Sequence, residues 1–490
     1  MLPGARAIVA TATTLALVTP VGAQSADPVE RLRRDLTAIF TDQAVDHAQW
    51  SVQVSSLKAG DSLFSLNARR LQVPASNQKM LTCAVAAEKL GWDFTYTNRV
   101  YALGKINAGV LEGDLVVTSD GDPTINPRHP ARWAALDDWA KQLSARGIHL
   151  ISGQLIGDDN AFAEPGWGPG WSWDDIPLGY GAPVSALQYN ENEVELVIIA
   201  GAQPGARATI STSPPGSGLV IDHGMTTGPA GSETKVTIER VPGSNILSVR
   251  GQIAADAAAV SEKVAVPNPT LMYVNAFREA LARYGIFVGG NPIDIDDLRL
   301  APDLANATLL VEDHSPPLSE IIDVTLKWSR NLYAETLLRT LARPETPATA
   351  ETGLKVLRDT LRSWGVGNEY YLARDGSGLS RYDYLTPNAL TIILTYLYLN
   401  PAYAELFRNT LPVAGVSGSL ASRMGGTPAS DRVWAKTGAM SQVRSISGYI
   451  MTLDHESLAF AIIVNGFRIP AREIDATMDK ALLKLVEFKR

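Results

Sequence analysis

The hydrophobic pattern of this chain changes character twice along its length. Residues 76–90 have helical spacing that ends at Gly91, whereas residues 97–311 form many short alternating segments separated by Gly, Pro and Ser turns. Helical spacing returns at Ser319. A β-rich block of this size between two helical regions is typical of an insertion rather than of a domain appended in sequence. We therefore expect the regions on either side of the block to fold together.

These outer regions predict a mixture of helices and strands. Alternating runs at 50–54 and 62–66, joined by a Lys-Ala-Gly-Asp turn, predict a β-hairpin. The last helical pattern carries acidic residues that offset its basic ones, so we expect it to pack against a sheet rather than lie on a membrane. The other predicted elements are helices at 28–46, 270–284, 352–364, 388–399 and 473–488 and strands at 194–199, 235–238, 246–249, 443–453 and 457–464.

The composition excludes several classes of protein. Hydrophobic residues make up 46% of the 490 residues and charged residues 19%, which is ordinary for a globular protein and unlike disordered or collagenous chains. The formal net charge is −8, and no long Lys/Arg block occurs. Because phosphate binding requires a clustered basic surface, nucleic acid is not expected as a partner.

The N-terminal segment predicts export. Arg6 precedes an apolar run of small residues at 7–18, and Val21-Gly22-Ala23 precedes Gln24 in the manner of a cleavage site. The alternative is an uncleaved anchor helix, but the apolar run is short and three threonines dilute it. We expect a signal peptide at 1–23 and an exported, periplasmic protein that has at most peripheral contact with the membrane.

The sequence offers no pattern of metal ligands. Cys83 is the only cysteine and lies in the apolar helical run 80–87, so a buried small side chain is expected rather than a catalytic thiol. The six histidines are scattered along the chain without ligand spacing. We therefore expect neither a metal nor an organic cofactor.

Three short motifs occur in an order that predicts acyl-transfer chemistry. They are Ser76-Asn77-Gln78-Lys79, Ser329-Arg330-Asn331 and Lys436-Thr437-Gly438, the combination found in penicillin-binding proteins and serine β-lactamases. Each motif alone is weak, since the segments 55–58 and 232–235 also read Ser-x-x-Lys. Ser55 lies in a predicted strand-to-turn segment and Ser232 in a predicted turn, whereas Ser76 begins a strong helical pattern.

The spacing of the first motif has a chemical reason. Residues three apart on a helix share a face, so Lys79 can reach the Ser76 hydroxyl, which needs an adjacent base to become nucleophilic. Burial and the positive charge of Lys436 would lower the pKa of Lys79 enough to populate the neutral amine. The structural alternatives are a helix-capping Ser76, a solvated Lys79, a polar break between two helices at the second motif and a strand-end turn at the third.

Further segments carry a family resemblance that extends from about residue 30 to the end of the chain. With the three motifs, the sequence resembles the class C low-molecular-mass penicillin-binding proteins, the D-alanyl-D-alanine carboxypeptidase/endopeptidases. The segments that carry the resemblance are 74–79, Gly113-Asp114-Leu115, Gly121-Asp122-Pro123, Val184-Ser185-Ala186-Leu187, Asp375-Gly376-Ser377-Gly378-Leu379-Ser380 and Leu411-Pro412-Val413-Ala414-Gly415.

The resemblance implies an α/β (α+β) fold. This is a β-lactamase/transpeptidase-like serine domain with a large β-rich insertion that forms two smaller domains. The implied boundaries are 28–96 and 312–490 for the penicillin-recognising domain, 97–192 and 263–311 for inserted domain II, and 193–262 for the nested domain III.

The resemblance also implies a role for each residue of the three motifs. Ser76 would be the acylated nucleophile, Lys79 its general base and Ser329 the hydroxyl that relays a proton to the leaving D-alanine. On the substrate side, Asn331 would bind the substrate amide, Lys436, Thr437 and Gly438 would hold the terminal carboxylate, and Ala439 would share the oxyanion site with Ser76 through its backbone N–H.

Two positions depart from the family pattern. Ala439 stands where the family commonly has Thr, so one hydroxyl of the carboxylate site is missing, and Ser419 also replaces a usual Thr. The lost hydrogen bond to a charged group is worth about 1.5–3 kcal/mol. We expect the chemistry to survive and the substrate preference to shift.

The implied activity is a serine DD-peptidase that acts on peptidoglycan stem peptides and is inhibited covalently by β-lactam antibiotics. Two alternatives are a serine β-lactamase and a catalytically silent wall-binding scaffold. Three pairs of adjacent acids are interpreted as solvated loop residues rather than as glycosidase carboxylates: Asp158-Asp159, Asp174-Asp175 and Asp296-Asp297. The Trp-rich segment 167–173 is interpreted as a loop packed by its own aromatic side chains rather than as a contact for glycan.

Overall fold

A five-stranded antiparallel sheet forms the base of the molecule in the computed structural model, which describes residues 1, 4, 27–241, 243–343 and 345–490. Its strand order is β18-β19-β20-β1-β2, so segments about 400 residues apart in sequence are neighbours. The predicted hairpin is confirmed, because β1 and β2 pair directly. The strands are β1 (Gln49–Ser56), β2 (Ser62–Leu66), β18 (Val433–Met440), β19 (Val443–Met451) and β20 (Ser457–Asn465).

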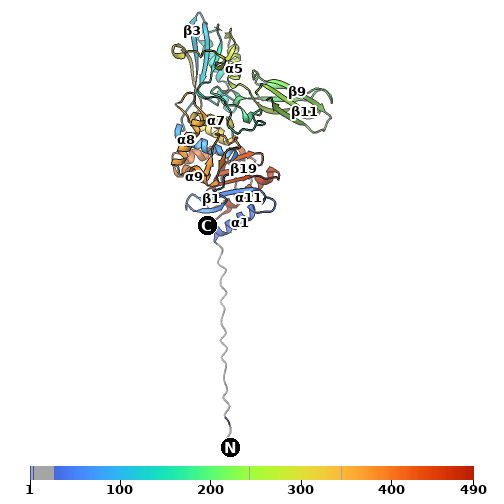
Figure 1. The fold of residues 1–490 in the computed structure, drawn as a ribbon, viewed down its shortest axis with the longest axis vertical. Coiled ribbons are helices and arrows are strands. Elements are labelled where there is room, and N and C mark those ends of the chain that lie inside the picture. The colour runs from blue at the N-terminus through green and yellow to red at the C-terminus, as the bar shows by residue number, and fades with distance from the viewer. Residues whose placement is uncertain (2–3, 5–26, 242, 344) are drawn as a thin grey trace.

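Helices α1 (Pro28–Phe40) and α11 (Ala471–Glu487) cover one face of this sheet (Figure 1). Their apolar stripes join one buried cluster with the inward side chains of the strands. The last helix therefore packs on the sheet, as its charge pattern predicts. No helix in the described part of the chain is both long and apolar enough to span a membrane.

The opposite face carries a larger group of helices around α2 (Gln78–Leu90). Ten consecutive residues of α2, 78–87, are buried, so this helix lies inside the domain and not on its surface. Cys83 is fully buried there, and burial raises the pKa of its thiol to about 12, which confirms the prediction of an inert side chain. The helices around α2 are α6 (Leu318–Lys327), α7 (Asn331–Thr340), α8 (Ala350–Ser363), α9 (Pro387–Leu399) and α10 (Ala404–Asn409).

A seven-stranded sheet rises from this base between α2 and α6 (Figure 1). Helices α4 (Ala135–Ala145) and α5 (Pro269–Arg283) pack on it around the fully buried Trp139. The sequence predicts α5 but not the short α3 (Pro130–Trp133) or α4. The strands are β3 (Thr97–Asn107), β4 (Val110–Ser119), β5 (Leu150–Ile151), β6 (Leu155–Asp158), β13 (Phe287–Val288), β14 (Pro292–Asp294) and β15 (Thr308–His314).

A smaller β unit projects sideways from this insertion, where Figure 1 labels β9 and β11. It consists of two three-stranded sheets that share one apolar cluster. Strand β12 pairs with β7 up to Ala265, three residues beyond the boundary predicted at 262. The strands are β7 (Glu193–Ile199), β8 (Thr209–Ser213), β9 (Val220–Gly228), β10 (Lys235–Arg240), β11 (Ile246–Ala254) and β12 (Val260–Ala265).

The two remaining strands, β16 (Tyr371–Leu372) and β17 (Tyr384–Leu385), pair around the segment 373–383. The predicted signal peptide at 1–23 lies outside the described residues except for Met1 and Gly4. Most other predicted elements occur within a few residues of their expected bounds. The first helix is the exception, since it ends at Phe40 rather than at 46.

Candidate active site

Ser76 lies in a single turn of 3₁₀-helix, η1 (Ala75–Asn77), that leads directly into α2. The sequence predicts that this serine opens the helix, and the structure places it in the turn just before. The preceding residue, Ala75, is buried and has a φ of 47°, a left-handed conformation that few non-glycine residues adopt. Such strain is characteristic of functional sites and is sustained by the packing around the turn.

A buried hydrogen-bond network ties this turn to β19. The Asn77 amide donates to the Ser445 hydroxyl at 2.6 Å, and its carbonyl oxygen accepts from the Ser447 hydroxyl. Ser445 in turn donates to the carbonyl oxygen of Pro74 at 2.6 Å. These positioning residues were missed by sequence reasoning, because nothing in the sequence of β19 signals that it meets residues 74–77.

Lys79 joins the first two motifs. Its fully buried ammonium group donates to the Ser76 hydroxyl at 2.8 Å, to Asn331 Oδ1 at 2.6 Å and to the carbonyl oxygen of Ser377 at 2.7 Å. The structural alternative of a solvated lysine is therefore wrong. A base this close to a serine hydroxyl has the geometry required to accept its proton.

Burial lowers the pKa of Lys79 from its usual value to about 8. Asp375 and Glu335 oppose this shift by stabilising the charged form, while the positive charge of Arg330 adds to it. Lys436, whose charge is expected from the sequence to lower the pKa of Lys79, is not among the groups that shift it, and the positive charge that does so belongs to Arg330. Burial first and then the charge of Lys79 lower the pKa of Lys436 well below its usual value.

The second and third motifs meet at Ser329. Lys436, fully buried, donates to the Ser329 hydroxyl at 2.8 Å and to the carbonyl oxygen of Thr437 at 2.6 Å. Ser329 has a φ of 57° and lies between α6 and α7, where the polar break in the helical pattern predicts an interruption. Asn331 begins α7 and donates its amide to the carbonyl oxygen of Tyr180 at 2.8 Å.

Strand β18 lies at the edge of the main sheet and borders the site. A Cβ atom at Gly438 would lie 2.2 Å from Ser445 Oγ and 3.1 Å from the backbone nitrogen of Ser76, so only glycine fits there. The Thr437 and Ser419 hydroxyls are hydrogen-bonded at 2.6 Å. Ala439 is exposed and lines the cleft beside them.

Buried acids hold the segment 375–378 against Lys79. Asp375 accepts hydrogen bonds from the backbone N–H groups of Gly378 and Ser380, both at 2.7 Å. Glu335 accepts from the N–H groups of Gly376 and Ser377 at 3.0 and 2.8 Å. The acids thereby position the Ser377 carbonyl that Lys79 contacts. Sequence reasoning assigned them no role, although segment 375–380 was among those that carried the family resemblance.

These elements surround a cleft of about 390 Å³. The main domain contributes one wall and the segment 172–180 contributes the other. The Trp-rich loop before this segment is attached through the Trp171 indole, which donates to Asp375 at 2.9 Å. The cleft is lined by Ser76, Ser172, Asp174, Asp175, Tyr180, Ser329, Asn331, Gly378, Leu379, Arg381, Ala439, Met440 and Ser441.

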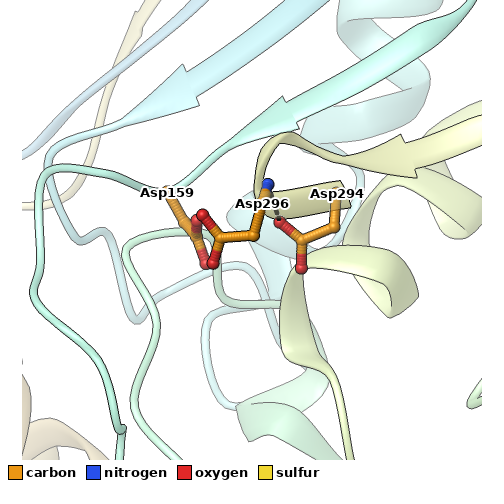
Figure 2. A group of neighbouring side chains, drawn as sticks. All are labelled: Asp159, Asp294 and Asp296. Atoms are coloured by element: carbon orange, nitrogen blue, oxygen red, sulfur yellow. Dashed lines mark hydrogen bonds between the residues drawn. The ribbon is translucent and has the colours of Figure 1, made fainter. Parts of the chain in front are cut away.

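A second group of ionisable side chains lies in the insertion. Figure 2 shows the carboxylates of Asp159, Asp294 and Asp296 pointing toward one another, with oxygen atoms within 4.8 Å. Asp159 and Asp294 are buried, so the interpretation of the Asp158-Asp159 pair as solvated is wrong for Asp159. Ser185 and Thr270 donate hydrogen bonds to Asp159, and burial raises the pKa of Asp294 to about 6. Protein groups thus satisfy the buried carboxylates.

Comparison with known proteins gives a consistent result. Residues 32–485 match the model of the D-Ala-D-Ala carboxypeptidase 3 (S13) family. A D-alanyl-D-alanine carboxypeptidase of Actinomadura sp. (strain R39) is 33% identical over 468 residues, which cover 93% of this chain and 85% of the relative. The D-alanyl-D-alanine carboxypeptidase DacB of Haemophilus influenzae is 26% identical over 429 residues, which cover 86% of each chain.

The fold is also shared with solved structures. The crystal structure of penicillin binding protein 4 (dacB) from Haemophilus influenzae superposes with a TM-score of 0.80 at 25% identity and covers 92% of this chain and 98% of that one. A structure of the same protein complexed with a β-lactam superposes with a TM-score of 0.76 at 24% identity and covers 93% and 100% of the two chains.

Proposed function

Because this chain belongs to the D-Ala-D-Ala carboxypeptidase 3 (S13) family and is a serine-type DD-peptidase of peptidoglycan, we propose that Ser76 is its acylated nucleophile and Lys79 the base. The 2.8 Å contact between Lys79 Nζ and Ser76 Oγ inside a buried network carries this assignment. The alternatives of a β-lactamase and of a silent scaffold are not favoured by the family.

In the first half of the reaction, neutral Lys79 accepts the Ser76 proton while Ser76 Oγ attacks the carbonyl carbon between two D-alanines. Negative charge develops on the carbonyl oxygen, which the backbone N–H groups of Ser76 and Ala439 stabilise. The Ser329 hydroxyl, held by Lys436, delivers its proton to the leaving nitrogen. The proton that Lys79 took from Ser76 then replaces it on Ser329, so that Lys79 is neutral again. The C–N bond breaks, D-alanine leaves and the rest of the stem stays esterified to Ser76.

In the second half, water attacks the ester carbonyl while neutral Lys79 accepts one proton from the water. The bond between the acyl carbon and Ser76 Oγ breaks, Lys79 returns the proton to Ser76 Oγ, and the shortened stem leaves with a new carboxyl group. The terminal carboxylate of the substrate is held by Lys436, Thr437 and the backbone at Gly438. An arriving carboxylate favours the charged form of Lys436 and so offsets the effect of its burial. Asn331 exchanges its hydrogen bond to the Tyr180 carbonyl for one to the substrate amide.

Several finer assignments belong to the same proposal. Cleavage of D-alanyl cross-links uses identical chemistry on a larger leaving group, and β-lactams acylate Ser76 as substrate analogues, in line with the β-lactam complex of the Haemophilus influenzae relative.

We place the protein in the periplasm, with at most peripheral membrane contact. The three domains are the segments 28–96 with 312–490, 97–192 with 263–311, and 193–262. The pairing of β12 supports extending the third to 265.

Mass spectrometry after incubation with a fluorescent penicillin tests the assignment. We expect an adduct on Ser76 that is absent from the Ser76→Ala variant. The matched control is Ser232→Ala, which alters a second Ser-x-x-Lys sequence and should retain the adduct. Rapid hydrolysis without an adduct would instead indicate a β-lactamase. A folded protein with neither adduct nor hydrolysis would contradict the acyl-enzyme.

A further inference from the structure

A second cavity, of about 520 Å³, lies between the Trp-rich loop and the nested β unit. Its volume is within the range of small-molecule sites. One side is formed by Trp167, Trp173 and Ile176, and the other includes Arg240, Asn245 and Pro267. No role in the chemistry of Ser76 falls to any of these residues.

Among the described residues that line this cavity, only Arg240 is charged, and it is 9% exposed. One of its amino groups donates to the Ala265 carbonyl, but Nε has no hydrogen-bond partner and no carboxylate among the described residues pairs with the guanidinium. A buried cation without a counter-ion is costly, and burial accordingly lowers its pKa. An anion bound in the cavity would relieve this cost, and a carboxylate matches the guanidinium geometry best.

The wall formed by Trp167, Trp173 and Ile176 is apolar and partly open. Trp173 is 66% exposed, which is unusual for a large aromatic side chain, and the indole N–H of Trp167 is buried without a partner. The exposed indole face of Trp173 and the side chain of Ile176 can contact a methyl group or another apolar part of a ligand. The cavity therefore combines one anion site with an apolar surface next to it.

This cavity and the catalytic cleft share one thin wall. Ser172 and Asp174 line the cleft, whereas Trp173, between them in sequence, lines the second cavity. Consecutive Cα atoms are about 3.8 Å apart, so only the thickness of this segment separates the two spaces. Ligands in the cleft and in the second cavity would therefore contact neighbouring residues of the same segment.

We infer that the second cavity binds the carboxylate end of a further peptidoglycan stem peptide, distinct from the stem whose bond is cut. The carboxylate pairs with Arg240, and the adjacent alanine methyl group lies against Trp173 and Ile176. The choice of ligand rests on the proposed function, since stem peptides carry the free carboxylates of this polymer. The glycan offers none where its muramic carboxyl is amide-linked to the stem.

Neighbouring charges set the direction of the ligand. A depression on the far side of Trp167 and Pro267 is lined by Glu164, Asp296 and Asp297. These acids repel a carboxylate from that end, so the anionic terminus is directed to Arg240 and the rest of the stem runs toward solvent or the cleft.

The binding test uses protein whose Ser76 is already acylated by penicillin, so that the cleft is blocked. A stem tetrapeptide ending in a free D-alanine carboxylate is titrated while tryptophan fluorescence is recorded. We expect saturable binding, weakened about tenfold or more in Arg240→Gln and Trp173→Ala, because an ion-paired hydrogen bond is lost in the first. Arg207→Gln, an exposed arginine in the same β unit, is the matched control and should bind normally.

A kinetic measurement on the Arg240→Gln variant complements the binding test. With a cross-linked stem-peptide dimer that has a free carboxylate as substrate, Arg240→Gln should raise KM about tenfold and leave kcat unchanged. With an acylated tripeptide that ends in D-Ala-D-Ala, the variant should have the same kinetic constants as the wild type. The inference would be overturned in the binding test if a C-terminally amidated tetrapeptide bound equally well, or if a neutral disaccharide bound instead. It would be overturned in the kinetic test if Arg240→Gln reduced the cleavage of both substrates equally. Failure of penicillin to acylate Ser76 would contradict the proposed function and is detected separately by mass.

Discussion

Gly438 lies so close to Ser76 that a Cβ atom at this glycine would approach the Ser76 backbone nitrogen to 3.1 Å. The same atom would lie 2.2 Å from Ser445 Oγ, the hydroxyl that links Asn77 to the Pro74 carbonyl. The close approach of β18 to η1 therefore sets the width of the site at the proposed oxyanion position.

Gly438→Ala is expected to slow acylation by penicillin by about 100-fold, because displacement of reacting groups by roughly 1 Å has an effect of this size. The second-order rate constant of acylation measures it. Gly425→Ala is the matched control, since its added Cβ meets no atom closer than 3.7 Å. An acylation rate within a factor of three of wild type in Gly438→Ala would contradict the proposed role of this contact.

The pH dependence of acylation reports on Lys79. Only the neutral amine can accept the Ser76 proton, so the rate should rise with pH and have its midpoint near 8, the pKa that burial imposes on Lys79. Glu335 stabilises the charged form, and Glu335→Gln keeps an oxygen for the N–H groups of Gly376 and Ser377. This variant should therefore move the midpoint to lower pH.

Asp359→Asn, which removes an exposed acid on α8, is the control for this experiment and should leave the midpoint in place. A rate profile that is flat between pH 6 and 10, or an upward shift in Glu335→Gln, would exclude Lys79 as the titrating base.

Ala439→Thr should restore the hydroxyl that this chain lacks beside the carboxylate site. One added hydrogen bond to a charged group is expected to lower KM for a D-Ala-D-Ala substrate by about tenfold and to leave kcat nearly unchanged. Ala439→Val has the same shape without the hydroxyl and separates the hydrogen bond from packing. Equal effects of the two variants on KM would show that volume at this exposed position is the cause.

The sequence by itself was sufficient to identify the three motifs, the serine that we propose as nucleophile and the interruption of the main sheet by a long insertion. Local rules carry this information: Ser76 and Lys79 are one helical turn apart, Gly91 ends α2, and alternation marks β1, β19 and β20. The short α3 and α4 were missed because they lie among segments of strand-like pattern.

Only the tertiary structure decided how these parts act together. The contacts of Asn77 with β19, of Glu335 with the backbone before Gly378 and of Lys436 with Ser329 join residues more than 40 positions apart, and the first and the last join residues more than 100 apart. The lowered pKa values of Lys79 and Arg240 arise from burial, which depends on packing from several elements at once. Local pattern therefore identifies the reacting side chains, and long-range packing sets their protonation, their distances and the second cavity beside them.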